Sequence, residues 1–159
     1  MGNTVCFTGH RQIPDEQYPT LHALLSDTVE QEIQRGATVF RAGGAIGFDT
    51  LAALTVLSLR LRYPHIRLEL ILPCPSQTRG WKEDDRRLYE QILEQADAYR
   101  FVSDVYYRGV LQARNRALVE DADVCISYLT TSGGGTAFTV KEALRKGVRL
   151  VNLADAISK

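Results

Sequence analysis

The amino-acid sequence predicts an α/β protein with a doubly wound, Rossmann-like fold, in which helices cover both faces of a mostly parallel sheet. Short apolar segments alternate along the whole chain with longer segments whose apolar residues recur at helical spacing. This alternation is typical of βαβ units, whose right-handed crossovers place helices on both faces of a sheet. The 159 residues and the hydrophobic fraction of 45% suit one core, so we expect residues 1–159 to form a single Rossmann-like nucleotide-binding domain.

Strands and helices are expected in alternation, starting with a strand. The strands cover residues 5–8, 37–42, 66–75, 98–103, 122–129 and 148–153. The helices cover residues 18–35, 48–62, 82–95, 108–120 and 137–146. Gly36 and Gly147 end the first and the last helix, because glycine readily adopts the left-handed conformation that follows a helix. The longest irregular stretch is 73–81, "PCPSQTRGW", and a loop of that length in a compact domain is often functional.

Composition and charge exclude several classes of protein. Lysine plus arginine and aspartate plus glutamate both number 19, so the chain is formally neutral and lacks the basic excess of a general nucleic-acid binder. No apolar run approaches the roughly 20 residues of a membrane helix, and the polar N-terminus does not resemble a signal peptide. Cys6, Cys74 and Cys125 lie in apolar stretches without metal-ligand spacing. They indicate reduced, buried thiols in a cytoplasmic protein, with no metal site.

Glycine, hydroxyl and cationic side chains follow the expected strands. In a doubly wound sheet, ligands bind outside the carboxyl ends of the strands. The segments that reach this edge are "TGHRQIP" at 8–14, "AGGAIGFD" at 42–49, "PCPSQTRGW" at 73–81, "SDVYYRG" at 103–109 and "TTSGGGT" at 130–136. We therefore expect one ligand site along this edge.

The segment "SGGGT" precedes the last expected helix. Glycines let backbone N–H groups approach an anion, and a helix N-terminus adds about half a positive charge. Ser132 and Thr136 offer further hydrogen bonds or a helix cap. Three consecutive glycines, Gly133 to Gly135, exceed the need of a tight turn and favour phosphate binding.

The segment "AGGAIGFD" follows the same logic with Gly43, Gly44 and Gly47, and adds an acid. A carboxylate would repel a neighbouring phosphate, so Asp49 is expected either to cap the helix or to contact a sugar hydroxyl. Neither glycine segment has the G-x-G-x-x-G spacing of a dinucleotide fingerprint, and the chain has no P-loop motif.

Two further pairs of side chains are candidates. His10 and Arg11 follow Gly9 at the tip of the first strand, where a ligand role and a structural role both remain open. Arg79 and Trp81 lie in the long loop, where the indole either stacks on a base or covers the core.

Several stretches, taken in order, resemble one family. "CFTGHR", "RAGGAIGFDTLAA", "LILPCPSQTRGW", "ARNRALVEDADVCISY" and "SGGGTAFTVKEALRKG" are similar to the YpsA-like proteins, over nearly the whole chain. This family belongs to the SLOG superfamily, which joins the DNA-processing protein DprA and the LOG cytokinin-activating enzymes. The resemblance implies a Rossmann-like fold and a nucleotide-type ligand at the glycine loops, and self-association into a dimer or a larger homo-oligomer.

The resemblance also suggests two alternative activities. LOG-type members hydrolyse the glycosidic bond of a nucleoside monophosphate, and Arg114 matches their upstream arginine. Their acidic residue two positions after the threonine has no match here, which leaves Asp49 and Glu142 as candidate acids. DprA-type members bind single-stranded DNA through a basic surface. The best matching patch here consists of Arg108, Arg114 and Arg116 with Tyr106 and Tyr107.

The sequence as a whole predicts the binding or sensing of a nucleotide or nucleotide derivative, of the nucleoside phosphate, ADP-ribose or NAD type, with no established cofactor and no membrane partner. Nucleotide hydrolysis is the alternative, and single-stranded DNA binding is a further one. The expected ligand-binding residues are Gly9, His10, Arg11, Gly43, Gly44, Gly47, Asp49, Arg79, Trp81, Arg114, Ser132, Gly133, Gly134, Gly135 and Thr136.

Overall fold

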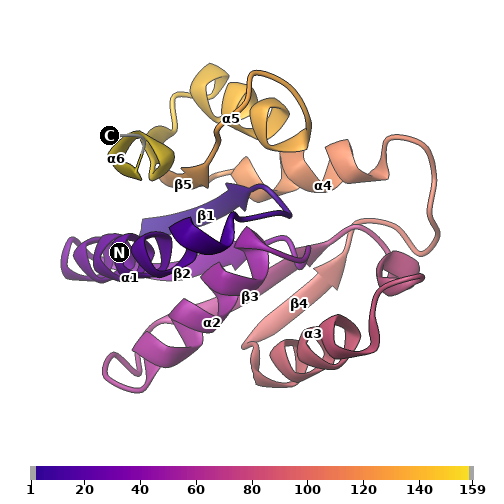
Figure 1. The fold of residues 1–159 in the computed structure, drawn as a ribbon, viewed down its shortest axis with the longest axis horizontal. Coiled ribbons are helices and arrows are strands. Elements are labelled where there is room, and N and C mark those ends of the chain that lie inside the picture. The colour runs from indigo at the N-terminus through magenta and orange to yellow at the C-terminus, as the bar shows by residue number, and fades with distance from the viewer. Residues whose placement is uncertain (1–2, 158–159) are drawn as a thin grey trace.

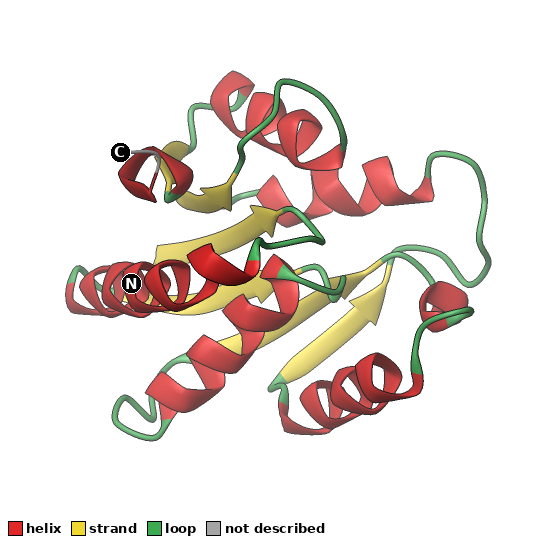
Figure 2. Ribbon diagram, viewed as in Figure 1, coloured by secondary structure: helices red, strands yellow, loops and turns green. Residues whose placement is uncertain are grey.

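The computed structural model describes residues 3–157, which form one parallel sheet with helices on both faces (Figures 1 and 2). The strands are β1 (Asn3–Gly9), β2 (Ala37–Ala42), β3 (Arg67–Leu72), β4 (Ala98–Phe101), β5 (Val124–Tyr128) and β6 (Arg149–Asn152). Their order in the sheet is β4-β3-β2-β1-β5-β6, and every neighbouring pair is parallel. The predicted α/β fold class is confirmed.

The helices form two layers. They are α1 (Tyr18–Gln34), α2 (Phe48–Arg60), α3 (Glu83–Gln95), α4 (Val110–Val119), α5 (Gly135–Arg145) and α6 (Ala154–Ile157). Helix α2 packs against α1, α3 and the first three strands, whereas α4 and α5 pack against each other and against the other face. The alternating side chains of the strands therefore feed two cores. Phe7 and Leu70 join the larger core, while their neighbours Cys6 and Ile71 join the smaller one beside α4 and α5.

Most element boundaries agree with the sequence prediction, and the differences have local causes. Helix α5 begins at Gly135, two residues earlier than predicted, because Gly134 takes a positive φ of 93° and becomes the N-cap. Helix α4 begins after Gly109, which has a φ of 99°. The short helix α6 and two 3-10 turns, η1 (Asp15–Gln17) and η2 (Pro75–Thr78), were not predicted, since single helical turns have no apolar periodicity to detect.

The three cysteines are free and buried, as the sequence indicates. Across residues 3–157, none of the helices combines the length and the apolar character needed to cross a bilayer.

The strand order reverses at β1. Strands β2, β3 and β4 lie on one side of β1, whereas β5 and β6 lie on the other. The loops that leave β1 and β5 therefore diverge to opposite faces and open a crevice above the carboxyl ends of these strands. Ligands of doubly wound proteins bind at such a reversal. In Figure 1 this edge of the sheet faces the right-hand side, where the loops before α2 and α4 also gather.

Candidate functional site

Three cavities lie along the carboxyl edge of the sheet, and Arg11 is among the lining residues of each. We call them the α1 groove, the inner cavity and the outer cavity. The α1 groove, of about 890 Å³, is lined by His10, Arg11, Gln12, Ile13, Pro14, Asp15, Gln17, Tyr128, Thr130 and Thr131. The inner cavity, of about 340 Å³, is lined by Thr8, Gly9, His10, Arg11, Ala45, Asp49, Leu111, Arg114, Asn115, Leu118, Gly135 and Thr136. The outer cavity, of about 550 Å³, is lined by Arg11, Pro73, Cys74, Ser76, Gln77, Arg79, Gly80, Trp81, Tyr106 and Leu111.

Arg114 forms part of the wall of the inner cavity and is only 6% exposed. It lies on α4, from which its Nη1 donates a hydrogen bond to the carbonyl of Gly43 and its Nε donates to Asn115 Oδ1 over 2.8 Å. These bonds fix the guanidinium against the loop before α2. Its third nitrogen, Nη2, has no hydrogen-bond partner within residues 3–157.

Asp49 reaches the same cavity from the first turn of α2 and is also 6% exposed. Its Oδ2 accepts a hydrogen bond from the N–H of Ala45 over 3.2 Å. Gly47 occupies the N-cap position, and no side chain caps this helix. The predicted capping role of Asp49 is therefore wrong, because its carboxylate folds back onto the preceding loop, one turn before the helix begins.

Asp49 and Arg114 meet over Gly43. A Cβ at Gly43 would lie 2.8 Å from Arg114 Nη1 and 2.9 Å from Asp49 Oδ2, so any larger residue would force one of these charged groups to move. Burial raises the pKa of Asp49, and the charges of Arg114 and Arg11 and the Ala45 hydrogen bond only partly offset it. Burial likewise lowers the pKa of Arg114, against the opposing charge of Asp49. Groups perturbed by burial beside a charged partner in a cleft are typical of functional sites.

The two glycine segments differ in what surrounds them. A Cβ at Gly47, whose φ is 81°, would collide with the backbone of Arg11, and one at Gly44, whose φ is 77°, would collide with Leu72. By contrast, nothing lies within 4 Å of a Cβ placed at Gly133 or Gly134. The first segment thus uses its glycines to pack protein against protein, while the second leaves the N-terminus of α5 open.

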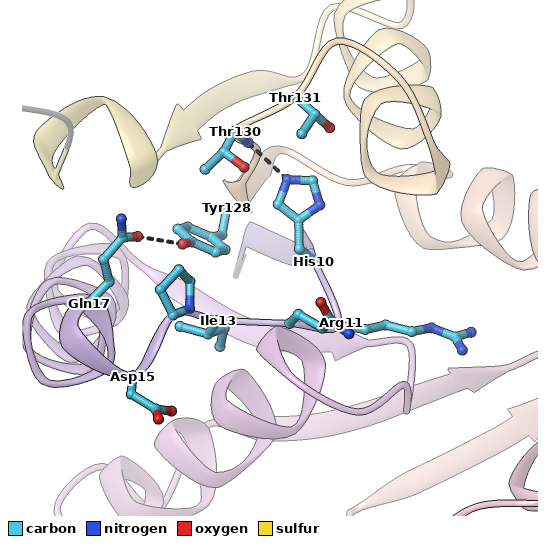
Figure 3. Close-up of a pocket in the computed structure, with 10 residues that line it drawn as sticks. His10, Arg11, Ile13, Asp15, Gln17, Tyr128, Thr130 and Thr131 are labelled. Carbon is cyan, nitrogen blue, oxygen red and sulfur yellow. Dashed lines mark hydrogen bonds between the residues drawn. The ribbon is translucent and has the colours of Figure 1, made fainter.

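His10 joins the loops that follow β1 and β5. Its Nε2 accepts a hydrogen bond from the N–H of Thr130 over 2.9 Å, which requires a neutral imidazole (Figure 3). Burial lowers the pKa of His10 and favours that neutral form. In the same view, Tyr128 donates its hydroxyl to Gln17 Oε1 over 2.6 Å, and Arg11 points away from the α1 groove. His10 therefore has a structural role, since it connects two loops at the carboxyl edge of the sheet. It also lines the α1 groove and the inner cavity.

The outer cavity combines aromatic and cationic side chains. Trp81 is half-buried and its ring meets Tyr89 edge to face, with centroids 5.5 Å apart. Arg79 and Tyr106 border the same cavity and are exposed. Two aromatic side chains in the lining of one cavity suit the flat, apolar surface of a heteroaromatic ring.

The structure does not bring every predicted residue to the crevice. Glu142 lies on α5 outside the lining of all three cavities, and it pairs with Arg145 at 2.7 Å. Ser132 is exposed in the loop and borders none of these cavities, whereas Thr136 is buried in the first turn of α5 and lines the inner cavity without being its cap.

The predicted basic patch is divided between different environments. Arg114 is buried, and Arg116 stacks over the ring of Phe138 at 5.2 Å. Arg108 and Arg116 are both exposed, but only Arg108 directly follows Tyr106 and Tyr107 in the chain. The prediction of one cationic surface that contains all three arginines is therefore wrong, because Arg114 is buried.

Sequence reasoning missed several polar residues of the crevice, including Thr8, Asn115 and Gln17. Thr8 and Asn115 line the inner cavity and are 6% and 7% exposed. Gln17 supports Tyr128 from the start of α1. Asn115 directly follows Arg114 in "ARNRA". A polar residue at this position of the helix was the one signal that could have marked it as a site residue.

The reversal of strand order, the open N-terminus of α5 and the buried Asp49–Arg114 wall define a Rossmann-like protein with a polar crevice at its switch point. Within that class, residues 5–149 match the model of the YspA SLOG family. The chain therefore belongs to this family, which confirms the resemblance of its motifs to the YpsA-like proteins.

Two relatives match a large part of the chain. A UPF0398 protein of Bacillus anthracis (strain A0248) is 28% identical over 132 residues, which span 76% of this chain and 72% of the relative. One from Bacillus thuringiensis (strain Al Hakam) is 32% identical over 107 residues, which span 65% and 58% of the two chains.

Two solved structures share the fold at low sequence identity. DNA processing protein A of Helicobacter pylori, whose structure concerns single-stranded DNA binding, superposes with a TM-score of 0.66 at 18% identity, over 93% of this chain. DprA of Streptococcus pneumoniae gives a TM-score of 0.67 at 16% identity, over 94% of this chain. The chain spans only 63% and 49% of these two proteins, so the likeness concerns the fold alone.

Proposed function

We propose that the protein binds a nucleotide or nucleotide derivative in the crevice at the carboxyl edge of its sheet. The observation that carries this proposal is the inner cavity, where Asp49 and Arg114 are each 6% exposed and line one space beside the open N-terminus of α5. Buried charged side chains are rare unless they pair or serve a site. A ligand with both polar and anionic parts is what such a wall can bind.

The anionic part would lie at the N-terminus of α5. Gly133 and Gly134 are exposed and a Cβ at either would meet nothing within 4 Å, and an 11-residue helix contributes a partial positive charge at this end. Arg11 is exposed, points away from the α1 groove and also lines the inner and outer cavities, so its guanidinium is available to a phosphate in either of these two. Arg79 supplies a second exposed cation at the far end.

The base would lie in the outer cavity. Trp81 and Tyr106 provide aromatic surface, and Gln77 and Ser76 provide hydrogen-bonding groups in the same wall. Small-molecule sites commonly combine such apolar surface with a few placed polar groups.

A binding screen with a matched pair of variants tests the proposal. The purified protein is titrated with AMP, ADP, ATP, ADP-ribose and NAD, and its melting temperature is recorded, since a ligand that binds only the folded state raises it. Gly133→Asp places a carboxylate in open space at the anion site and should abolish the shift, whereas Gly133→Ala adds only a methyl group and should preserve it. Equal shifts in both variants, or no shift with any nucleotide in the wild-type protein, would refute nucleotide binding at this loop.

A second candidate is single-stranded nucleic acid, favoured by the exposed loop before α4. Tyr106 and Tyr107 are 66% and 45% exposed and precede the exposed Arg108, which is the combination of stacking rings and a cation that single-strand binders use. Binding of a short oligonucleotide should weaken steeply as the salt concentration rises. Affinity that is flat in salt, or absent at low salt, would exclude this candidate.

A further inference from the structure

The inner cavity is lined by two side chains of opposite charge, Asp49 and Arg114, and each has a polar atom that makes no hydrogen bond within residues 3–157. Asp49 Oδ2 holds Ala45, while Oδ1 accepts no hydrogen bond within residues 3–157. Arg114 uses Nε and Nη1, while Nη2 has no partner there. In the described part of the chain, the fully enclosed side-chain polar atoms without a partner are Arg41 Nε and Ser127 Oγ. Asp49 Oδ1 and Arg114 Nη2 therefore keep contact with open space, and both residues line the inner cavity.

The chemistry of this gap selects among ligand groups. No ion pair within 4.0 Å joins Asp49 to Arg114 in the described residues, although both flank Gly43. A phosphate in the gap would be repelled by the carboxylate, and an ammonium would be repelled by the guanidinium. A hydroxyl group fits both, because it accepts from a guanidinium, which only donates, and donates to a carboxylate, which only accepts.

Neighbouring side chains extend this polarity. Thr8 and Thr136 line the same cavity, are 6% and 7% exposed, and their hydroxyls make no hydrogen bond within residues 3–157. Asn115 Nδ2 makes only a long bond of 3.5 Å, to the carbonyl of Gly135. The inner cavity, of about 340 Å³, thus combines neutral hydroxyl and amide groups with one acidic and one basic side chain. This combination suits the hydroxyl groups of a sugar.

We propose that Asp49 and Arg114 form a ribose subsite, in which a hydroxyl of the ribose diol bridges the carboxylate and the guanidinium. The proposal rests on the nucleotide-binding function above and makes it narrower. The ligand is a ribonucleotide or a ribose-containing derivative, and the subsite discriminates against its deoxy analogue. Asp49 is then a specificity-determining residue, and the phosphate lies outside its reach at the N-terminus of α5.

The test compares the sugar hydroxyls of one ligand. The tightest binder among the four ribonucleoside 5′-monophosphates and the four triphosphates is measured by calorimetry against its 2′-deoxy and 3′-deoxy analogues. A site built around a hydroxyl leaves charged partners unpaired when that hydroxyl is missing, so at least one deoxy analogue should bind about tenfold or more weakly. Equal affinity of all three ligands would overturn the ribose subsite while leaving nucleotide binding intact. Failure of every nucleotide to bind would refute the proposed function itself, and the subsite with it.

Two variants of adjacent residues assign the discrimination to Asp49. Asp49→Asn retains an oxygen that can accept from Ala45, so the loop stays supported, but its amide no longer supplies the second acceptor. The ratio of ribo to deoxy affinity should then fall below about threefold. Thr50→Val is the control, because Thr50 Oγ1 also holds Ala45, by donating to its carbonyl over 3.0 Å, yet Thr50 does not line the cavity. Its ratio should equal that of the wild type. A ratio that persists in Asp49→Asn, or falls equally in Thr50→Val, would overturn the role of Asp49.

Discussion

Replacement of Gly47 by alanine should destabilise the protein far more than replacement of Gly133. Gly47 has a φ of 81° and a ψ of −123°, a conformation that residues with a Cβ rarely adopt, and it is followed directly by α2. The added Cβ would also meet the backbone carbonyl of Arg11 in the loop after β1. That loop cannot move freely, because Phe48 donates its N–H to the carbonyl of His10 over 3.1 Å.

The magnitude follows from these two penalties. Backbone strain of this kind costs about 1–3 kcal/mol, and forcing an extra methyl group into packed surroundings costs about 1–3 kcal/mol more. A central sum of about 4 kcal/mol is a large part of the roughly 5–15 kcal/mol that stabilise a typical domain. For a chain of 159 residues it corresponds to a fall in Tm of roughly 8–16 °C.

Thermal unfolding followed by circular dichroism measures the effect, with urea unfolding as an independent readout. Gly133→Ala is the matched control, because its Cβ would meet nothing within 4 Å and its φ lies outside the range that alanine avoids, so its Tm should stay within about 2 °C of the wild type. Similar Tm values for the two variants would show that the segment of Gly47 is no more tightly packed than the segment of Gly133, and would refute the prediction.

Three further predictions concern the crevice. Because burial lowers the pKa of His10 below its ordinary value of 6.5, the unfolded chain binds this proton at a higher pH than the folded one, and stability should fall as the pH drops from about 7 to 5. In His10→Gln, which can still accept from Thr130, the Tm should depend less on pH over this range; an unchanged pH profile would contradict the assignment. Tyr128→Phe removes the 2.6 Å bond to Gln17 and should cost about 1 kcal/mol in urea unfolding, whereas a loss beyond about 3 kcal/mol would indicate a larger role for the hydroxyl. Any hydrolysis of a bound nucleotide, followed by chromatography of the products, should disappear in Asp49→Asn, since Asp49 is the one carboxylate among the residues that line the inner cavity; unchanged turnover would exclude it as the acid.

The fold could be predicted because its signals are local. Alternating apolar runs and helical periodicity report which residues must be buried, and the glycines at 36 and 147 report where helices end, so nearly every long element is found at its predicted place. The misplaced start of α5 shows the limit of such signals. Gly134 and Gly135 differ in conformation but not in chemistry, and only the folded backbone assigns one to the cap and the other to the helix.

The candidate site was predictable as a set of loops but not as an arrangement. Placing polar residues after each strand was sufficient to find His10, Arg11 and Asp49, because parallel strands bring all their carboxyl ends to one edge. Arg114 lies within a helix and was found only through its match to the arginine of LOG-type members. The roles of those residues depend on their partners. Asp49 was expected either to cap the helix or to contact a sugar hydroxyl. It does not cap the helix but accepts a hydrogen bond from the N–H of Ala45, a contact that depends on the path of the loop.

The sequence by itself determined the class of fold, the edge of the sheet at which the candidate site lies, and the family, since each depends on the order of residues along the chain. Only the tertiary structure decided that the two glycine segments have opposite purposes. One is packed against the loop after β1, while the other is open at the N-terminus of α5. It also decided that Arg114 is buried over Gly43 instead of lying on a basic surface. The physical reason is that burial and pairing are properties of residues far apart in the chain. Gly43 and Arg114 meet only because β2 ends and α4 begins at the same edge of the sheet.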